Sequence, residues 1–271
     1  MISNHIKGIN HFGIQTVDIG STAGFLIAEL GFDTDSEYVY ERAGGERHVA
    51  YLRRGSMCIE VCSSSQPAEA HGRFANIAFD TADLDELYER LAGKYGESRL
   101  AWCSNLRPQI SNEPDCFSFT TPLGEEYLFY SRPGHTYSGS RNISGRGHAA
   151  VNVSNLENSV SFYRRLGFSL VRRTDYGDPA SPAKTALMSF GAGSLLLIQS
   201  PGGSAFSEKG WLDHLSLYVD DPYLLHETMK DSGARLGERG VMHFCTEYID
   251  VEYFNALGPD GEVLELSRVS R

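Results

Sequence analysis

Cysteine is scarce in this sequence, which has only Cys58, Cys62, Cys103, Cys116 and Cys245. Their number is odd and they form no Cys-x-x-Cys motif, which argues against a paired disulfide framework. We therefore interpret them as reduced thiols. Reduced thiols are typical of cytoplasmic proteins, so a cytoplasmic location is our prediction.

Long hydrophobic runs are also missing. No apolar stretch approaches the roughly 20 residues that a membrane-spanning helix needs. Residues 1–10 are too polar to resemble a signal peptide. These two absences exclude a membrane-spanning protein and give no indication of export.

Basic residues are also few compared with acidic ones. The chain has 24 Lys and Arg residues against 35 Asp and Glu residues, a formal net charge of −11. Such an excess of acidic groups argues against nucleic acid or an anionic membrane as a partner. The partner that we expect is a small-molecule substrate. The sequence does not fix the oligomeric state, since a single chain can complete its own site, and a homodimer is one of the states that it allows.

What the sequence does contain is a fourfold repeat with a period of roughly 65 residues, the mark of one supersecondary unit used four times. Each repeat shows a strand pattern, a helical pattern and three further strand patterns. The opening strands are expected at residues 11–18, 76–83, 148–155 and 214–221. The closing strands are expected at residues 56–61, 124–129, 194–199 and 261–266.

Four such repeats indicate an α+β fold of four βαβββ modules. A chain of 271 residues with 41% hydrophobic content can bury two ordinary cores, so the modules divide naturally into two pairs. Residues 134–144 are rich in helix and strand breakers and are expected to be a linker. We therefore predict an N-terminal domain at residues 1–133 and a C-terminal domain at residues 145–271.

Alternation along the strands puts histidine and glutamate on one face. Successive residues of a strand point to opposite sides of a sheet, so His11 faces away from Phe12 and Ile14. By the same rule Glu60 lies opposite Ile59, and Glu265 lies opposite its apolar neighbours. A polar face that carries imidazole and carboxylate groups on neighbouring strands is what a metal site requires.

These modules resemble the vicinal oxygen chelate superfamily, which includes glyoxalases, bleomycin-resistance proteins and extradiol dioxygenases. The resemblance covers about residues 6–269 and is most specific at residues 148–168 and 258–265. It implies that paired modules form cupped, half-open β-barrels. It also implies that one cup holds a divalent metal ion bound by up to four residues, two from each module.

The family's ligand positions are carried over residue by residue. In chain order they fall on His11 and Glu60, Asn76 and Leu128, His148 and Ile198, and His214 and Glu265. The side chains of Leu128 and Ile198 cannot bind a metal ion. The resemblance therefore implies one complete site.

Two pairings of the modules stay open from the sequence. If the first pairs with the fourth, as in single-chain glyoxalase I, one cup contains His11, Glu60, His214 and Glu265. If the modules pair in sequence, as in extradiol dioxygenases, His148 joins His214 and Glu265 in a facial triad suited to iron(II). Both pairings use His214 and Glu265.

The first pairing implies a metal-dependent isomerase, epimerase or lyase that acts on a small oxygenated substrate. In such enzymes a nickel, cobalt, zinc or manganese ion stabilises an enediolate, and Glu60 and Glu265 would act as the catalytic bases. The alternatives are an iron(II) extradiol-type dioxygenase and a binding or resistance protein without catalysis. Residues 184–190 contain no histidine, which weakens the dioxygenase hypothesis.

Overall fold

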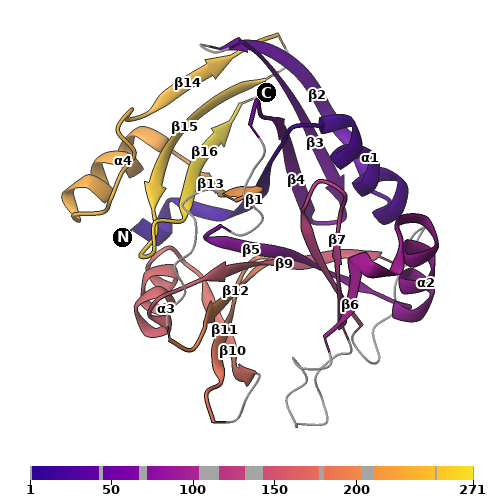
Figure 1. Ribbon diagram of the computed structural model, residues 1–271. Helices are drawn as coiled ribbons and strands as arrows, with labels where there is room; N and C mark the ends of the chain where they lie inside the picture. The colour runs from indigo at the N-terminus through magenta and orange to yellow at the C-terminus, as the bar shows by residue number, and fades with distance from the viewer. Residues whose placement is uncertain are drawn as a thin grey trace.

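The computed structural model describes two eight-stranded sheets and four α-helices (Figure 1). The described residues are 2–42, 45–66, 72–103, 116–131, 143–176, 180–202, 210–247 and 249–270. Each repeat folds as a strand, a helix and three further strands, which confirms the predicted α+β class.

The first two modules occupy the N-terminal half of the chain. The first contains β1 (Ile6–Thr16), α1 (Ile19–Leu30), β2 (Asp33–Arg42), β3 (Gly45–Arg54) and β4 (Met57–Ser63). The second contains β5 (Phe74–Thr81), α2 (Leu84–Tyr95), β6 (Leu100–Trp102), β7 (Cys116–Thr120) and β8 (Glu126–Tyr130). Short 3-10 helices lie at η1 (Ile2–Asn4) and η2 (Glu97–Arg99).

The last two modules repeat this order. The third contains β9 (Ile143–Asn152), α3 (Leu156–Arg165), β10 (Ser169–Tyr176), β11 (Ala183–Phe190) and β12 (Gly193–Gln199). The fourth contains β13 (Leu212–Val219), α4 (Pro222–Asp231), β14 (Met242–Cys245), β15 (Asp250–Leu257) and β16 (Val263–Val269).

An aspartate or asparagine caps the start of the helix in every module. Asp18, Asp83, Asn155 and Asp221 are the N-caps, and each side chain accepts a hydrogen bond from a backbone N–H in the first turn. Such a side chain satisfies a donor that the helix itself leaves free. In α4, proline follows the cap, at a position where its missing N–H costs nothing. The end of each opening strand therefore fixes where the helix begins.

Strand order decides between the two module pairings. One sheet runs β14-β15-β16-β13-β1-β4-β3-β2, and the other runs β10-β11-β12-β9-β5-β8-β7-β6. The first sheet joins the first and fourth modules through the antiparallel pair β1 and β13. The second joins the second and third modules through β5 and β9. The pairing is therefore first with fourth and second with third.

Modules that are consecutive in the chain pack together through their helices. Phe25 of α1 stacks on Phe119 and Tyr127 of the second module, with ring centroids 5.3 and 5.1 Å apart. In the C-terminal half, Tyr163 of α3 donates a hydrogen bond to Glu262 of the fourth module at 2.9 Å. Each half of the chain thus has packing of its own, and both halves contribute to one continuous apolar core.

The predicted domains at residues 1–133 and 145–271 do not each contain a cup. Each sheet takes strands from both sides of the predicted boundary, so both cups are built between the halves. Residues 134–142 of the predicted linker lie outside the described residues. Ile143 and Ser144, its last two residues, already belong to β9.

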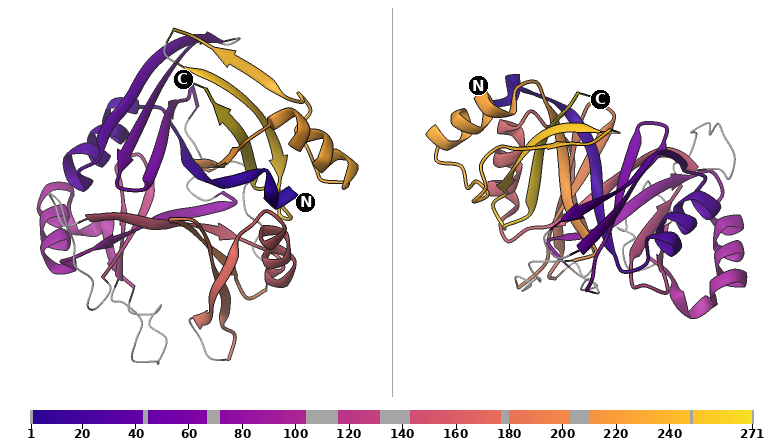
Figure 2. Two further views of the ribbon diagram at one scale, coloured as in Figure 1. Left: turned by 180° about the vertical axis from the view of Figure 1, so that it is seen from behind. Right: turned by 90° about the horizontal axis from the view of Figure 1, so that it is seen from above.

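The two sheets lie back to back and open in opposite directions (Figures 1 and 2). Contacts of β13 with β5 and of β4 with β9 join their convex faces. In the first sheet the edge strands β2 and β14 approach each other, and the rings of Tyr40 and Phe244 lie 4.7 Å apart. This contact brings the two edges of the first sheet together, so the sheet curves into a half-open barrel. Its concave face forms the first cup.

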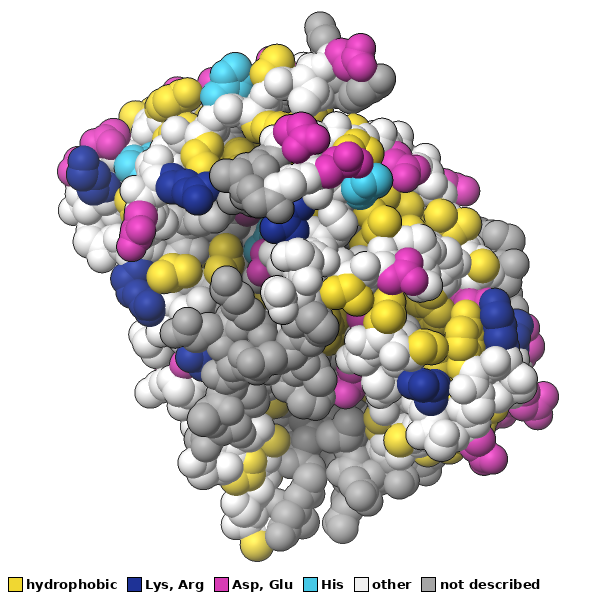
Figure 3. Space-filling view, turned by 45° about the horizontal axis from the view of Figure 1, so that its top comes forward, with side chains coloured by type: hydrophobic (Ala, Val, Ile, Leu, Met, Phe, Trp, Pro, Cys, Tyr) yellow, Lys and Arg dark blue, Asp and Glu magenta, His cyan; other side chains and the backbone are white. Residues whose placement is uncertain are grey.

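The exposed surface carries charges of both signs. On the face shown in Figure 3, Lys and Arg side chains lie scattered among Asp and Glu side chains. No helix among the described residues is long and apolar enough to cross a membrane. The expectation that nucleic acid and membranes are not partners stays a prediction.

Candidate metal centre

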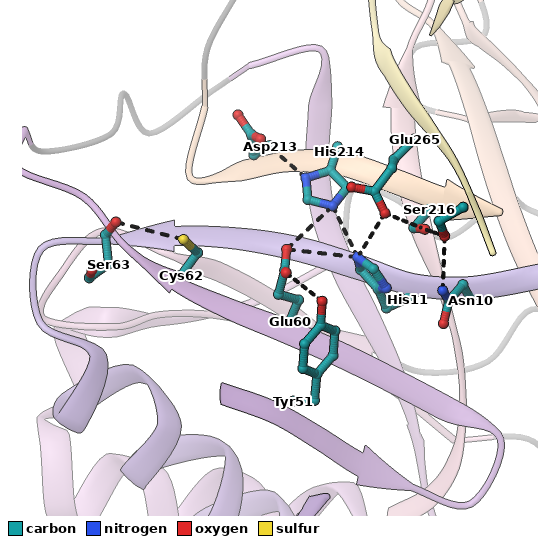
Figure 4. A network of polar contacts seen from close by, with 11 residues as sticks. Asn10, His11, Tyr51, Glu60, Cys62, Ser63, Asp213, His214, Ser216 and Glu265 are labelled. Carbon is teal, nitrogen blue, oxygen red and sulfur yellow. Dashed lines mark hydrogen bonds and ion pairs between the residues drawn. The ribbon is translucent and has the colours of Figure 1, made fainter. Parts of the chain in front are cut away.

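Four side chains from four neighbouring strands meet in the first cup (Figure 4). His11 comes from β1, Glu60 from β4, His214 from β13 and Glu265 from β16. The order of these strands in the sheet is β16, β13, β1, β4. The two histidines therefore lie on the inner strands, with one glutamate on the strand to either side.

The donor atoms of these side chains converge on one small volume. Nε2 of His11 lies 3.1 Å from Nε2 of His214. Oε2 of Glu60 lies 3.4 Å from Nε2 of His214 and 3.7 Å from Nε2 of His11. Oε1 of Glu265 lies 3.8 Å from the same His11 nitrogen. The four residues that both the repeat and the resemblance singled out are thus brought together.

Three of the four residues, His11, Glu60 and His214, bring their donor atoms within 4.8 Å of one another, a spacing that fits a single divalent ion, whereas Glu265 lies just outside that group. Two ligand atoms that each lie about 2.0–2.2 Å from the same ion are about 2.8–3.6 Å apart at tetrahedral or octahedral angles. The distances at His214 fall in that range, and the distances from the carboxylates to His11 are slightly longer. Two imidazoles with two carboxylates form a donor set that suits first-row divalent metals.

A hydroxyl group holds each glutamate. Tyr51 on β3 donates a hydrogen bond to Oε1 of Glu60 at 2.7 Å, and Ser216 on β13 donates to Oε1 of Glu265 at 2.9 Å. Tyr51 was not among the residues predicted from the sequence. It lies directly across the β3–β4 hairpin from Glu60. Pairing residues strand by strand outward from the hairpin turn would have placed Tyr51 opposite Glu60.

Asp213 orients the ring of His214. Its Oδ2 lies 3.1 Å from Nδ1 of His214. In a regular strand, adjacent side chains point to opposite faces. Here the pairing jumps from Gly13 and His214 to Ile14 and Leu212, so Asp213 is the extra residue of a β-bulge. A bulge re-aims a side chain, and the carboxylate consequently turns Nε2 of His214 toward the other donors.

Gly13 leaves the space that the ring of His214 fills. A Cβ atom at this position would lie 2.1 Å from Cε1 of His214, which real side chains do not tolerate. Gly13 faces His214 on one neighbouring strand and Glu60 on the other. The imidazole therefore lies directly over the β1 backbone.

Burial and charge make the two histidines different. For His214, burial opposes protonation, but the bond to Asp213 and the charges of Glu265 and Glu60 prevail and raise its pKa to about 10. Burial, together with the charge of His214, lowers the pKa of His11 well below its ordinary value. The setting between the carboxylates thus favours positive charge, which is what a divalent metal ion would supply.

The pKa of Glu60 also departs from its ordinary value. Burial raises it, the charge of His214 opposes the rise, and the charge of Glu265 adds to it. The side chain of Glu60 is only 15% exposed. A carboxylate in this setting holds a proton more readily than one in water.

A cleft with a volume of about 270 Å³, near the lower end of the range for small-molecule sites, opens beside these residues. Its lining includes Asn10, Tyr51, Arg53, Tyr218 and Glu265. Clefts of this size are typical of sites for small molecules. A substrate in this cleft would lie against His11 and Glu265.

His148 lies in the other sheet. It is on β9, which pairs with β5 and β12, whereas His214 and Glu265 are on β13 and β16 of the first sheet. The triad that sequential pairing would have formed from His148, His214 and Glu265 is therefore not assembled.

Strand register identifies the residues of the second cup that correspond to His11 and Glu60. The residue two positions after His11 pairs with Glu60. In the same way, the residue two positions after Asn76 pairs with Leu128. Asn76 and Leu128 thus take the places that the resemblance assigned to them.

Register corrects one of the assigned positions. The residue two positions after His214 pairs with Glu265, and the residue two positions after His148 pairs with Leu196. The assignment of Ile198 was therefore wrong by two residues. Both side chains face the cup, so alternation alone could not separate them. A leucine at this position cannot bind a metal ion.

A second group of donor atoms lies on the surface. His243, Cys245 and Asp250 offer ligand atoms within 4.8 Å of one another, and the first two residues are exposed. Nε2 of His243 lies 2.6 Å from Oδ1 of Asp250. This group lies outside the cup. It could bind a second metal ion, so measurements of metal content have to distinguish it from the cup.

The sequence matches the model of the Glyoxalase/Bleomycin resistance protein/Dioxygenase superfamily over residues 8–99 and 145–266. The chain belongs to this superfamily. No protein with curated annotation matches the sequence. The superfamily contains several chemistries, so membership alone leaves the reaction open.

Solved structures of the glyoxalase superfamily share the whole fold. Glyoxalase I from Zea mays superimposes with a TM-score of 0.75 at 16% identity, covering 98% of this chain and 94% of that chain. A putative dioxygenase from Bacillus subtilis superimposes with a TM-score of 0.69 at 13% identity, covering 98% and 86%. At these identities the similarity is one of fold.

Proposed function

We propose that this protein is a metal-dependent enzyme of the glyoxalase superfamily that moves a proton beside a carbonyl group of a small oxygenated substrate. The observation that carries the proposal is the position of Glu60 and Glu265. They approach the histidine pair from opposite sides of the cup, on β4 and β16 (Figure 4). Two carboxylates on opposite sides of one reacting centre suit an isomerase, an epimerase or a lyase.

The residues that would hold the ion are His11, Glu60, His214 and Glu265. A bound divalent ion would polarise a carbonyl or hydroxyl oxygen of the substrate. Nickel, cobalt, zinc and manganese all suit this donor set. Asp213 keeps His214 in the orientation that binding needs.

The proton itself is handled by the glutamates. Oε1 of Glu60 accepts the hydrogen bond from Tyr51, and Oε2 faces the histidines. Oε2 is therefore the oxygen that would hold the ion in the absence of substrate and that, once substrate displaces it, would take the proton from the substrate carbon. Because burial raises the pKa of Glu60, this carboxyl group can hold the proton until it is returned.

Return of the proton determines the product. In an isomerisation the proton goes to the adjacent carbon, and in an elimination it goes to the leaving group. In an epimerisation Glu265 delivers a proton to the opposite face of the same carbon, and Glu60 keeps the one that it removed until solvent takes it. Each route returns as many protons as it removes.

The test is exchange of carbon-bound hydrogen with solvent. Hydroxyacetone, a small α-hydroxyketone, is incubated in D₂O with the zinc-loaded or nickel-loaded protein and followed by ¹H NMR. We expect loss of the signal from the protons beside the carbonyl. Because general acid–base catalysis contributes about 10²–10⁴-fold, Glu60→Gln or Glu265→Gln should slow the exchange by at least about 100-fold.

Two outcomes would overturn the proposal. Oxygen uptake with catechol by the iron(II)-loaded protein, without hydrogen exchange, would identify a dioxygenase. Metal-dependent binding of acetohydroxamate, which presents two neighbouring oxygen atoms, without exchange of hydroxyacetone or of dihydroxyacetone, would identify a binding protein.

A further inference from the structure

The second cup contains His148 but no carboxylate at the positions that correspond to Glu60 and Glu265, and it encloses a cavity. The volume of this cavity is about 270 Å³, near the lower end of the range for small-molecule sites. Its lining includes apolar side chains at the positions where the first cup has carboxylates, namely Leu128 and Leu196, and further apolar side chains from Leu187 and Ile198. A cavity of this size with mostly apolar walls is characteristic of a small-molecule site.

The side-chain amide oxygen of Asn76 in this cavity has an unmet hydrogen-bonding capacity. Oδ1 of Asn76 is buried and has no hydrogen-bond partner among the residues that the structure describes. Buried acceptors of this kind are rare, because losing water without gaining a donor is unfavourable. Asn76 occupies the position that corresponds to His11, at the centre of the cup, and it lines the cavity. A ligand with an O–H or N–H group would supply the donor.

The charged side chains of this cavity do not favour an ionic ligand. Glu126 and Arg172 both contribute to its lining, and their charges have opposite signs. An anion would meet the carboxylate of Glu126, and a cation would meet the guanidinium of Arg172. A ligand without net charge avoids both costs.

We propose that the second cup is a metal-independent binding site for a small neutral compound that has an apolar body and one hydroxyl or N–H donor. The apolar body packs against Leu128, Leu187 and Leu196. The donor bonds to Oδ1 of Asn76. The site is separate from the metal centre, because the two cups are on different sheets that face in opposite directions.

A matched set of fluorescent probes tests the proposal. 2-Naphthol has a neutral apolar body and one O–H donor, 2-methoxynaphthalene lacks the donor, and 2-naphthoate carries a negative charge. Each is titrated into the full-length protein after removal of metal with EDTA. One hydrogen bond is commonly worth about a fivefold difference in affinity. We expect 2-naphthol to bind about fivefold more tightly than 2-methoxynaphthalene, and 2-naphthoate to bind most weakly.

Substitutions then assign the binding to the second cup. Asn76→Leu should bring the affinity for 2-naphthol down to that for 2-methoxynaphthalene. Leu128→Gln should weaken both, and it serves as the second variant if Asn76→Leu does not fold. The control is Glu60→Gln in the first cup, which should leave both affinities unchanged.

Three results would overturn the proposal. The first is no binding of 2-naphthol up to about 1 mM, the lower end of specific affinity. The second is equal affinity of wild type for 2-naphthol and 2-methoxynaphthalene. The third is loss of binding in Glu60→Gln with no effect of Asn76→Leu or Leu128→Gln, which would place the probe in the first cup.

Discussion

Nε2 of His11 and Nε2 of His214 lie 3.1 Å apart, although 203 positions separate the two residues in the chain. The contact exists because β1 and β13 are antiparallel neighbours at the centre of the first sheet. The candidate metal centre therefore depends on the two ends of the chain meeting. Substitutions in β1 or β13 should therefore weaken metal binding more than they disturb the structure of the second sheet.

Gly13→Ala should weaken metal binding. A Cβ atom at this position would lie 2.1 Å from the ring of His214, so the ring must move away from the other donors. We expect zinc affinity, measured by calorimetry, to fall by at least about tenfold, as it does when ligand orientation is lost. Gly24→Ala is the control, because a Cβ atom at Gly24 meets nothing within 4 Å. Equal zinc affinity of the two variants would show that His214 does not need its present position.

Asp213→Asn should weaken metal binding without changing the shape of the site. The carboxylate lies 3.1 Å from Nδ1 of His214, and such partners orient a ligating histidine and make it more basic. Losing them typically costs about 10–100-fold in metal affinity. The same loss is expected for zinc here, with the circular dichroism spectrum unchanged. Wild-type zinc affinity in this variant would limit Asp213 to a role in folding.

Asp18→Ala should lower the thermal stability by removing the cap of α1. The side chain of Asp18 accepts hydrogen bonds from the backbone N–H and the hydroxyl of Ser21. We expect the melting temperature at pH 7 to fall by about 2–4 °C in a chain of this size, while Asp18→Asn keeps most of the cap.

The effect of Asp18→Ala should depend on pH. The hydrogen bonds from Ser21 lower the pKa of Asp18 below 3.8 in the folded protein. A lowered pKa means that the stabilisation is complete above the unfolded value and is lost as the pH falls through the folded value. The difference in melting temperature between wild type and Asp18→Ala should therefore shrink below about pH 4. A constant difference across this range would rule out a contribution from the charge.

The sequence predicted the modules because their signals are local. The succession of strand and helix patterns in each repeat and the alternation around Glu60 and Glu265 are all visible within a few residues. The pairing of the modules was not visible, because both arrangements join strands of the same type and place His214 and Glu265 in one cup. Only the long-range contact of β1 with β13 decides it.

The surroundings of the site were harder to predict than its donors. Asp213 reaches His214 through a bulge, and a bulge breaks the alternation on which the prediction relied. The error of two residues that placed Ile198 at the position of Leu196 has a related cause. Alternation identifies the face of a strand, but only pairing with the next strand identifies the position along it.

Zinc binding to wild type, Glu60→Gln and His148→Ala tests the central claim, that the first and fourth modules share one metal centre. All three are compared in a Cys245→Ser background, so wild type here means wild type at every position except 245; the substitution removes a donor from the surface group of His243 and Asp250. The account predicts about one zinc ion per chain in wild type and His148→Ala, and at least tenfold weaker binding in Glu60→Gln. Loss of zinc from His148→Ala with full binding to Glu60→Gln would contradict it.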